Sequence, residues 1–578
     1  MKDTASENSR ILMDVIMARG VKTIIISPGS RNTPLIIAAE AREKLKKYVV
    51  ADERTAAFMA LGMAMGSRRP VALACTSGTA LYNYAPAVAE AFYQKIPLIV
   101  ISADRPAQWI DQDDSQTLRQ SGALANIVKA SFDIPLETEA PGPCANPAFT
   151  TEKHWFVNRL VNEAMTVATT GLRGPVHINI QLDNPLGKIV DVPEANERIV
   201  RVVENEDRMN QAVLDSVALE MMEKRILVVA GFMPPDDKLN RALIEFSRLP
   251  NVAVMCETLS NIHTPADTYL IDSLLARLSD EEKRNLKPDI VISIGGSLVS
   301  RMLKEYLRRA EGTVHWKLGD SPASTDTFQR LDAHFECDPA VFFQGVTAFI
   351  RHKEKCGQKI VHSGYSELWS AAREKASAIN ADKLRQAPWS ELTAHAQCLK
   401  ILSLGNFNLF FSNGTPIRYS QLAVERVWHA CYGNRGVSGI DGTNATALGL
   451  AMAKSKQPTL LLSGDLSFSY CPQILALKEY APNFKIIVFN NAGGGIFRFI
   501  RTTRSLPMRE EYLCAPPNIP LQKLCDAYGW NYLKAENMEE LHVSLAAFMV
   551  DDANMLLEIK TDPQSSADVL INFLEEKI

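Results

Sequence analysis

The feature that most constrains this chain is a pair of apolar strands, each followed by residues suited to hold an ion. The first strand, Thr459–Leu462, leads to Asp465, and the second, Lys485–Phe489, leads to Asn491 and three glycines. A helical segment over about residues 469–479 separates the two strands, which predicts a βαβ unit of a parallel sheet. Such sheets hold ligands at the carboxyl ends of their strands. We therefore expect Asp465 and Asn491 to face one ligand.

The ion that these side chains would hold is predicted from their oxygen atoms. A carboxylate from Asp465, an amide oxygen from Asn491 and the backbone carbonyl of Gly493, completed by phosphate oxygens, suit octahedral Mg²⁺ or the similar Mn²⁺. The glycines allow the backbone to approach a diphosphate closely. Taken alone, Asp465 is equally well explained as a cap of the following helix. The joint pattern favours an ion site.

The bulk composition excludes several classes of protein. With 578 residues, a net charge of −4 and a pI of about 6.3, the chain has no dominant basic patch, which disfavours a nucleic-acid partner. No apolar run reaches the length of a membrane span, so no membrane association is expected. The ten cysteines are scattered without a CxxC pair, which favours reduced thiols and a cytoplasmic location.

Short apolar runs alternate with helical segments along the whole chain, and this pattern predicts an α/β protein with three successive doubly wound parallel sheets. The predicted domains are residues 1–190, 208–355 and 384–578, joined by a linker near 188–207 and a charged helix near 363–383. In the first domain, strands are expected at Thr23–Ile26, Tyr48–Val50, Val71–Ala74, Leu98–Ser102 and Val176–Ile180. In the second domain, they are expected at Arg225–Ala230, Val252–Cys256 and Asp289–Ile294.

Several motifs follow these predicted strands: ISPGSRNTPL, DERTAAFMALGMA, TSGTALYNYAPAVAEA, ADRP, NRGVSGIDG and GDLSFSY…NNAGGGIF. Together they resemble enzymes dependent on thiamine diphosphate (ThDP) that decarboxylate or condense 2-oxo acids. Within that group they resemble the 2-succinyl-5-enolpyruvyl-6-hydroxy-3-cyclohexene-1-carboxylate (SEPHCHC) synthases of menaquinone biosynthesis. The resemblance covers essentially the whole chain and is weakest in the middle domain. It implies pyrimidine-binding, middle and diphosphate-binding domains in that order.

The resemblance also implies which residues hold ThDP. Glu53 matches the glutamate that contacts the aminopyrimidine ring and favours its imino tautomer, although a carboxylate at a helix start is also stabilised by the helix dipole. Ile440 matches the residue that props the coenzyme into a V shape, and its alternative is an ordinary core isoleucine. The full implied cofactor set is Glu53, Ile440, Gly464, Asp465, Leu466, Ser467, Asn491, Gly493, Ile496 and Phe497. A homodimer or dimer of dimers with active sites at the subunit interface is implied as well.

The substrates implied by the resemblance are 2-oxoglutarate, which loses CO₂, and isochorismate, which accepts the resulting carbanion in a 1,4-addition. Both carry carboxylates, which arginine binds in a bidentate manner. A single arginine is usually just solvated, but several fall at predicted strand ends or loops. The expected substrate residues are Ser30, Arg31, Arg105, Gln116, Arg301, Arg418 and Arg435. The expected catalytic residues are Glu53, Ser30, Arg31 and Gln116, of which Ser30 and Gln116 could stabilise developing oxyanions.

Two alternative functions remain open from the sequence. One is another ThDP-dependent decarboxylase or ligase, similar to acetolactate synthase, against which the arginine set argues. The other is a non-catalytic nucleotide-binding relative, although the middle domain has no GxGxxG motif with an acidic partner. The presence of Glu53 together with Asp465 and Asn491 argues against a non-catalytic protein.

Overall fold

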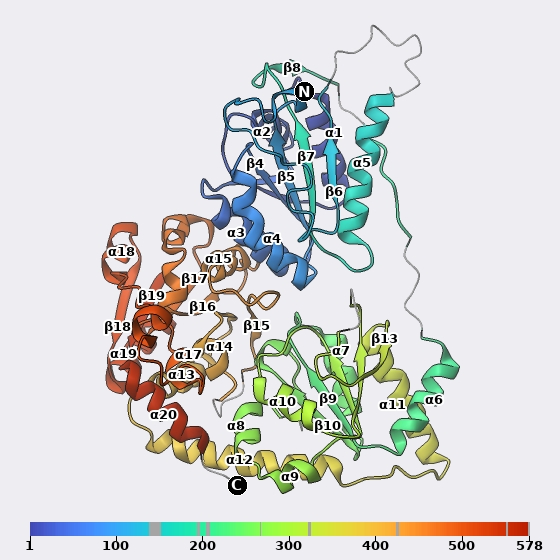
Figure 1. Ribbon diagram of the computed structural model, residues 1–578, viewed down its shortest axis with the longest axis vertical. Coiled ribbons are helices and arrows are strands. Elements are labelled where there is room, and N and C mark those ends of the chain that lie inside the picture. The colour runs from blue at the N-terminus through green and yellow to red at the C-terminus, as the bar shows by residue number, and fades with distance from the viewer. Residues whose placement is uncertain are drawn as a thin grey trace. The chain divides into compact units, whose positions relative to one another are not determined.

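The computed structural model describes residues 1–137, 152–193, 197–203, 209–265, 268–321, 325–422, 427–550 and 553–575 (Figure 1). Packing divides the chain into two compact units. The first contains residues 1–204 together with 434–455, and the second contains residues 205–433 together with 456–578. Part of the predicted linker, at residues 194–196 and 204–207, lies outside the described residues. Each unit is described by itself below.

A six-stranded sheet forms the centre of the first unit. Its strands are β2 (Thr23–Ile26), β3 (Lys46–Val49), β4 (Val71–Cys75), β5 (Leu98–Asp104), β6 (Ser131–Ile134) and β7 (Val176–Gln181). They lie in the order β3-β2-β4-β5-β7-β6, and every pair is parallel. The five strands predicted here are confirmed within two residues at their ends, and β6 was not predicted. A short antiparallel pair, β1 (Lys2–Thr4) and β8 (Ile189–Asp191), stands apart from this sheet.

Helices cover both faces of this sheet, as expected for a doubly wound fold. On one face, α1 (Glu7–Ala18), α2 (Thr33–Glu40) and α5 (Glu152–Thr169) share a hydrophobic core with β2, β4, β5 and β7. On the other face lie α3 (Glu53–Ser67) and α4 (Ala80–Gln94), as Figure 1 shows. A 3-10 turn at Ala107–Trp109, η1, follows β5.

The helix α15 (Thr443–Ala453) also belongs to the first unit, because it packs closely against α3. Glycines make this approach possible. A Cβ on Gly62 would lie 1.9 Å from the carbonyl oxygen of Thr446, and a Cβ on Gly449 would lie 2.0 Å from that of Met59. Residues 434–455 therefore join the N-terminal unit although the sequence places them in the third predicted domain. The predicted domain boundaries stay a prediction.

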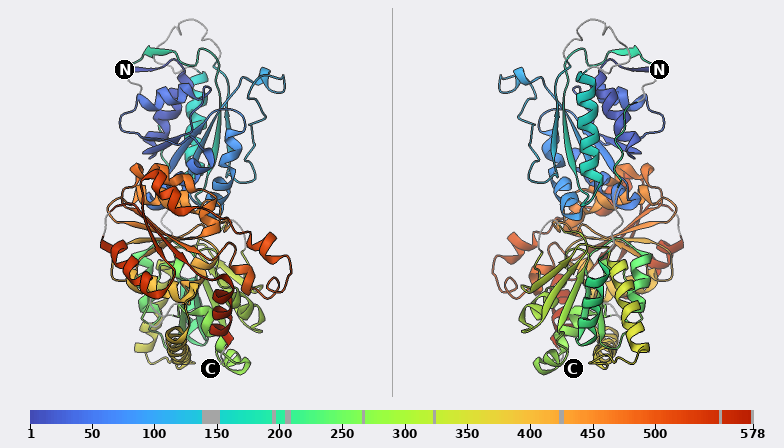
Figure 2. Two further views of the ribbon diagram at one scale, coloured as in Figure 1. Left: turned by 90° about the vertical axis from the view of Figure 1, so that its left-hand side faces the viewer. Right: turned by 90° about the vertical axis from the view of Figure 1, so that its right-hand side faces the viewer.

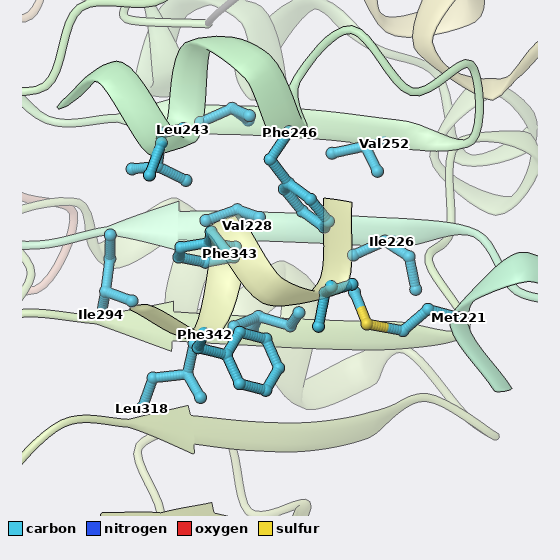
Figure 3. Close-up of a cluster of buried hydrophobic side chains, with 14 of the residues drawn as sticks. Met221, Ile226, Val228, Leu243, Phe246, Val252, Ile294, Leu318, Phe342 and Phe343 are labelled. Atoms are coloured by element: carbon cyan, nitrogen blue, oxygen red, sulfur yellow. The ribbon is translucent and has the colours of Figure 1, made fainter. Parts of the chain in front are cut away.

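The second unit contains two parallel sheets, the first of them five-stranded. Its strands are β9 (Ile226–Ala230), β10 (Val252–Cys256), β11 (Ile290–Ile294), β12 (Val314–Leu318) and β13 (Leu331–Phe335), in the order β10-β9-β11-β12-β13. On one face pack α6 (Gln211–Met222), α7 (Asp237–Phe246) and α11 (Pro339–Lys355). Figure 3 shows this core, in which Phe246, Phe342 and Phe343 lie beside Val228. The other face carries α8 (Ile271–Arg277), α10 (Arg301–Arg309) and α12 (Tyr365–Gln386).

The other sheet of this unit has six parallel strands and contains the βαβ unit that the sequence predicts. The strands are β14 (Asn408–Phe411), β15 (Ala430–Tyr432), β16 (Thr459–Gly464), β17 (Phe484–Asn490), β18 (Asn531–Ala535) and β19 (Met555–Lys560), in the order β15-β14-β16-β17-β19-β18. Helices α13 (Glu391–Leu402) and α19 (Met538–Val550) pack on one face. The side views in Figure 2 show the strands of this sheet between their helices.

The segment between β16 and β17 differs from the single helix predicted over residues 469–479. A short helix, α16 (Asp465–Ser469), starts directly after β16, and a 3-10 helix, η3 (Pro472–Tyr480), follows it. Pro472 lacks the N–H that a continuous helix needs, so the helix is interrupted there. The remaining helices are α9 (Asp280–Asn285), α14 (Thr415–Tyr419), α17 (Ile496–Phe499), α18 (Leu521–Tyr528) and α20 (Pro563–Glu575), with η2 (Thr258–Ser260) and the π-helical η4 (Arg509–Cys514).

The fold class is therefore the predicted one: three parallel-sheet α/β assemblies in a single chain. The nine cysteines in the described residues all have free thiols, and Cys144 lies outside those residues. None of the helices in the described part of the chain is both long enough and apolar enough to cross a membrane.

Candidate active site

The carboxyl ends of β16 and β17 bring the predicted ion ligands together. The two strands are adjacent and parallel, so Asp465 and the loop after β17 meet at one edge of the sheet. The N–H of Gly493 donates a hydrogen bond of 2.7 Å to Oδ2 of Asp465, and the N–H of Leu466 donates one of 2.9 Å to Oδ1. The convergence that the sequence predicts for this loop pair is thus present.

The electrostatics of this edge favour a cation. Asp465 is only 1% exposed, and burial raises its pKa to about 6, although the two backbone N–H groups lower the pKa in part. Burial disfavours the charged form of a carboxylate, and a nearby positive charge favours it. A bound cation would therefore favour the ionised form of Asp465 further.

The side-chain oxygen of Asn491 is a second buried group at this edge that could ligate an ion. Asn491 is 3% exposed, and its Oδ1 has no hydrogen-bond partner among the described residues. A buried acceptor without a partner is costly and calls for an explanation. In the described part of the chain, no group of three or more His, Cys, Asp or Glu could hold a metal ion. A mixed set of carboxylate, amide and carbonyl oxygens is the donor set that Mg²⁺ accepts, so these residues fit the ion.

The other end of the Asn491 amide is fixed by a buried glutamate. Nδ2 of Asn491 donates a hydrogen bond of 2.5 Å to Oε2 of Glu391, and the hydroxyl of Thr415 donates one to Oε1. Burial raises the pKa of Glu391 to about 7, while the hydrogen bonds from Thr415 and Asn491 lower it. The amide also lies over Gly495, where a Cβ would come within 2.3 Å of Nδ2. A side chain at position 495 would therefore displace the Asn491 amide from its present position.

A buried arginine holds the backbone of the same loop. Arg498 is 2% exposed, and its Nη1 and Nη2 donate to the carbonyl oxygens of Asn491 and Ala492 at 2.9 and 2.8 Å. Its Nη2 also pairs with Glu510 at 2.7 Å. Arg498 therefore fixes the turn that presents Gly493. Neither Arg498 nor Glu391 was singled out from the sequence.

The backbone of the loop explains its glycines. Gly493 has a φ of 103°, and a Cβ there would lie 2.1 Å from the carbonyl oxygen of Cys514, so no other residue fits. Ala492 also adopts a positive φ, of 58°, a conformation that asparagine tolerates better than alanine.

The other predicted cofactor residues of the second unit lie at the same sheet edge. Gly464 ends β16, and its N–H donates to Oγ of Ser412 on the loop after β14. Leu466 and Ser467 belong to α16, which starts there, and Ser467 is buried. Ile496 and Phe497, both half-buried, open α17 after the glycine loop. Their contacts with a cofactor stay a prediction.

In the first unit, two predicted arginines lie close together. Arg31 follows β2 and is 6% exposed, with Nη1 donating to the carbonyl oxygen of Leu182 at 2.9 Å. Burial lowers the pKa of Arg31, and the positive charge of Arg105 lowers it further. Arg105, at the end of β5, pairs with Asp114 at 2.6 Å. Two guanidinium groups at the carboxyl ends of β2 and β5, the strands on either side of β4, make this edge a suitable place for an anion.

Ser30 and Gln116 flank the same edge. Ser30 is exposed in the turn after β2, in which Gly29 packs against Thr76 so closely that a Cβ would lie 2.3 Å from the Cβ of Thr76. Gln116 is exposed, has a φ of 58°, and donates from Nε2 to the carbonyl oxygen of Ser77. Both residues thus lie at the carboxyl edge of the sheet, and their contacts with a substrate stay a prediction.

Glu53 is the first residue of α3 and is half-buried. The helix cap is the preceding residue, Asp52, whose side chain accepts from the N–H of Thr55. Glu53 lies in the first turn of α3, where its charge also interacts favourably with the helix dipole, so its catalytic role stays a prediction. Glu53 lies near two fully buried groups, Cys75 and Tyr84, since its negative charge adds to the effect of burial in raising the pKa of each.

Arg435 and Ile440 lie in the segment that joins the first unit, before α15. The N–H groups of Gly436 and Val437 donate to the buried carboxylate of Glu90 at 2.5 and 2.8 Å. Gly442 meets the ring of Phe58 on α3, where a Cβ would lie 2.1 Å from the ring. Both predicted residues are half-buried in this segment, which packs against the helix that Glu53 begins.

Arg301 and Arg418 belong to the second unit. The side chain of Arg301 is 75% exposed and pairs with Glu305 at 2.7 Å. Arg418 is half-buried on α14, and its charge acts on Asp272, a buried carboxylate whose pKa is raised by burial and lowered by Ser300 and Arg418. Substrate binding by either arginine stays a prediction.

Glu391 and Arg498 were missed because their sequence signals are weak. Glu391 follows Ser390 at the start of a helix, where a glutamate is common for reasons of helix capping and dipole alone. Arg498 has one signal, a charged residue inside the apolar run IFRFI directly after the glycine loop. A buried arginine there must find acceptors, and the nearest are the carbonyls of the loop itself.

Comparison with known proteins identifies the family. Residues 7–123 match the N-terminal TPP-binding domain of thiamine pyrophosphate enzymes, and residues 417–559 match the C-terminal TPP-binding domain of the same enzymes. The chain is 38% identical to a SEPHCHC synthase of Porphyromonas gingivalis, covering 97% of this chain and 96% of the relative. It is 34% identical to a SEPHCHC synthase of Flavobacterium johnsoniae, covering 97% of both chains.

A third relative agrees. The chain is 33% identical to a SEPHCHC synthase of Desulfotalea psychrophila, covering 95% of this chain and 97% of the relative. Both matching domains are those of enzymes that use thiamine pyrophosphate, another name for ThDP. The chain is therefore a ThDP-dependent enzyme that belongs to the SEPHCHC synthase family.

Proposed function

We propose that this enzyme decarboxylates 2-oxoglutarate and adds the resulting four-carbon carbanion to isochorismate, giving SEPHCHC in menaquinone biosynthesis, with ThDP and Mg²⁺ or Mn²⁺ as cofactors. The observation that carries the proposal is the ion-binding edge of β16 and β17. There the buried carboxylate of Asp465 accepts a hydrogen bond from the loop that carries Asn491, whose buried amide oxygen has no hydrogen-bond partner among the described residues, in an enzyme of a ThDP-dependent family. The printed names of the relatives support the product.

The residues that would hold the cofactors follow from their chemistry. Asp465, Asn491 and the carbonyl of Gly493 would hold the ion, and the ion would hold the diphosphate. Gly464, Leu466, Ser467, Ile496, Phe497 and Ile440 would line the coenzyme. Bound ThDP supplies a thiazolium ring that acts as an electron sink during decarboxylation. Glu53 would hold a proton at N1′ of the aminopyrimidine and so favour the tautomer that accepts a proton at the 4′-nitrogen.

The substrate carboxylates would be bound by arginine. Arg31 and Arg105 lie close enough for their charges to interact, and a dicarboxylate between them would offset their repulsion. We assign Arg301, Arg418 and Arg435 to the same task, in keeping with the expectation from the sequence. Ser30 and Gln116, on the same edge as Arg31, would donate hydrogen bonds to developing oxyanions.

We further propose a homodimer or a dimer of dimers as the active assembly and the cytoplasm as its location. The family resemblance supports the assembly, and the free thiols of the nine described cysteines agree with a reducing compartment.

An assay of CO₂ release tests this function. With ThDP and Mg²⁺ present, we expect CO₂ from 2-oxoglutarate and formation of the adduct only after isochorismate is added. Mass spectrometry of the product distinguishes the adduct from a free aldehyde. Turnover of pyruvate with no turnover of 2-oxoglutarate would favour the enzyme similar to acetolactate synthase instead. Absence of any ThDP-dependent turnover would favour the non-catalytic alternative.

Replacement of Arg105 with alanine tests the carboxylate site. We expect the KM of at least one of the two carboxylate substrates to rise about 10- to 100-fold, because a charge-assisted hydrogen bond contributes about 1.5–3 kcal/mol. Steady-state kinetics on each substrate provide the measurement. The matched control is Arg119→Ala, since Arg119 is 82% exposed and also pairs with an aspartate of the same loop, Asp111. Unchanged KM values for both substrates in the Arg105 variant would contradict a carboxylate site.

A further inference from the structure

A buried glutamate lies directly behind the proposed amide ligand of the ion. Glu391 is 1% exposed, and its two carboxylate oxygens have separate partners, the hydroxyl of Thr415 and Nδ2 of Asn491. The backbone N–H of Glu391 donates to Oγ of Ser566, and a capping box of Ser390 and Thr393 holds the start of its helix. The carboxylate therefore has a fixed position.

The consequence for Asn491 follows from the chemistry of its two ends. A side-chain amide can ligate a cation only through its oxygen, while its NH₂ group repels a cation. A carboxylate accepts hydrogen bonds and donates none, so Glu391 selects the NH₂ end of Asn491. The oxygen end must then point the other way, and that is the buried Oδ1 without a hydrogen-bond partner among the described residues.

We propose that Glu391 is a positioning residue that orients the Asn491 amide so that Oδ1 is available to the metal ion. This inference rests on the proposed ion site at Asp465, Asn491 and Gly493. Partners of this kind behind a metal ligand commonly change metal affinity by 10- to 100-fold when they are removed. Glu391 would act on the metal ion only through Asn491, because its own two oxygens accept hydrogen bonds from Thr415 and Asn491.

The surroundings of the amide explain why it needs such a partner. The amide lies over Gly495, which has no side chain to hold it in place. Arg498 holds the main-chain carbonyl of Asn491 and leaves the side chain untouched. The backbone and the side chain of Asn491 are thus fixed by two different charged residues, and Glu391 alone determines which end of the amide faces the ion.

The test is the affinity for Mn²⁺, measured by the electron paramagnetic resonance signal of the free ion. The titration is performed with saturating ThDP and without substrate, at pH 8, above the pKa of Glu391, so that turnover is not involved. The variants are Glu391→Met, Glu391→Asp and Glu391→Gln, each alone and combined with Asn491→Ala. The melting temperature of each variant reports whether it folds.

We expect distinct results from the three variants. Glu391→Met offers no acceptor to Asn491, and Glu391→Asp is one methylene too short to reach it, so each should weaken Mn²⁺ binding 10- to 100-fold. Glu391→Gln should stay within about fivefold of the wild type, because its oxygen can accept from Asn491 while the hydroxyl of Thr415 turns to accept from its NH₂. In the Asn491→Ala background, all three substitutions should have less than a twofold effect, since they act through Asn491.

Three results would overturn the inference. The first is wild-type Mn²⁺ affinity in the Met or the Asp variant, either of which suffices if the other does not fold. The second is an equal loss in the Gln variant, which would assign the effect to charge. The third is an undiminished effect in the Asn491→Ala background, which would indicate a general structural role. If the wild type binds no Mn²⁺ in the presence of ThDP, the proposed ion site fails and this inference fails with it.

Discussion

Replacement of Asp465 with alanine is expected to abolish the metal-dependent binding of ThDP. In the wild type, ThDP at a hundredfold excess over its Kd in the presence of Mg²⁺ should raise the free energy of unfolding by about 2.7 kcal/mol. Asp465→Ala removes the only carboxylate of the proposed ligand set, so this gain should vanish at the same concentrations. Thermal unfolding with and without each cofactor provides the measurement.

The Asp465→Ala variant should remain folded in the absence of cofactors. Removal of the buried charge of Asp465 stabilises the folded protein, because burial disfavours the charged carboxylate. Loss of the two hydrogen bonds from Gly493 and Leu466 destabilises it by a similar amount. The free energy of unfolding should therefore change by about 1 kcal/mol or less. A matched control is Glu558→Gln on β19, the strand beside β17, where the carboxylate of Glu558 accepts hydrogen bonds from Asn490 and Tyr532. This control should keep the Mg²⁺-dependent stabilisation. Unchanged ThDP affinity in Asp465→Ala would contradict the ion site.

Replacement of Glu53 with glutamine is expected to eliminate turnover while the protein stays folded. Proton transfer assisted by a positioned side chain contributes about 10²–10⁴-fold, so kcat for CO₂ release from 2-oxoglutarate should fall by at least about a hundredfold. The melting temperature should hardly change, because Asp52 and not Glu53 caps α3. Steady-state CO₂ release and thermal unfolding together provide the measurement.

The neighbouring aspartate supplies the opposite control. Asp52→Ala removes the cap of α3 and should lower the free energy of unfolding by about 1 kcal/mol while turnover is retained. We thus predict that Asp52 contributes to stability and that the adjacent Glu53 contributes to catalysis. Normal turnover in Glu53→Gln would contradict a catalytic role for Glu53, and so would a loss of stability equal to that of Asp52→Ala. Either result would indicate that Glu53 only interacts with the helix dipole.

Much of the fold could be predicted because the three large sheets are fully parallel and most of their central strands are buried. Strands such as Thr23–Ile26 and Val252–Cys256 are continuous apolar runs, and their predicted bounds agree with β2 and β10. Less regular strands escaped prediction. Leu331–Phe335 is only partly buried and carries charged residues, so it lacks the continuous apolar run that identifies a strand.

The meeting of the two loops that carry the proposed ion ligands could be predicted, because the carboxyl ends of adjacent parallel strands lie at one edge of a sheet. The partners behind those loops were not predictable in the same way. Glu391 is 100 residues from Asn491 along the chain, and their contact depends on how α13 packs on the sheet. Nor does local sequence indicate that residues 434–455 pack with the N-terminal unit, since that grouping depends on glycines 387 positions apart, Gly62 and Gly449.

The close packing of α3 on α15 has a consequence for folding during synthesis on the ribosome. Gly62 on α3 and Gly449 on α15 lie 387 residues apart, so at about 5–20 residues per second α3 waits roughly 20 to 80 s until α15 is translated. During that interval the alanine- and methionine-rich surface of α3, buried in the finished protein, stays uncovered. The nascent chain therefore exposes an apolar surface for many seconds, and chaperones bind surfaces of this kind.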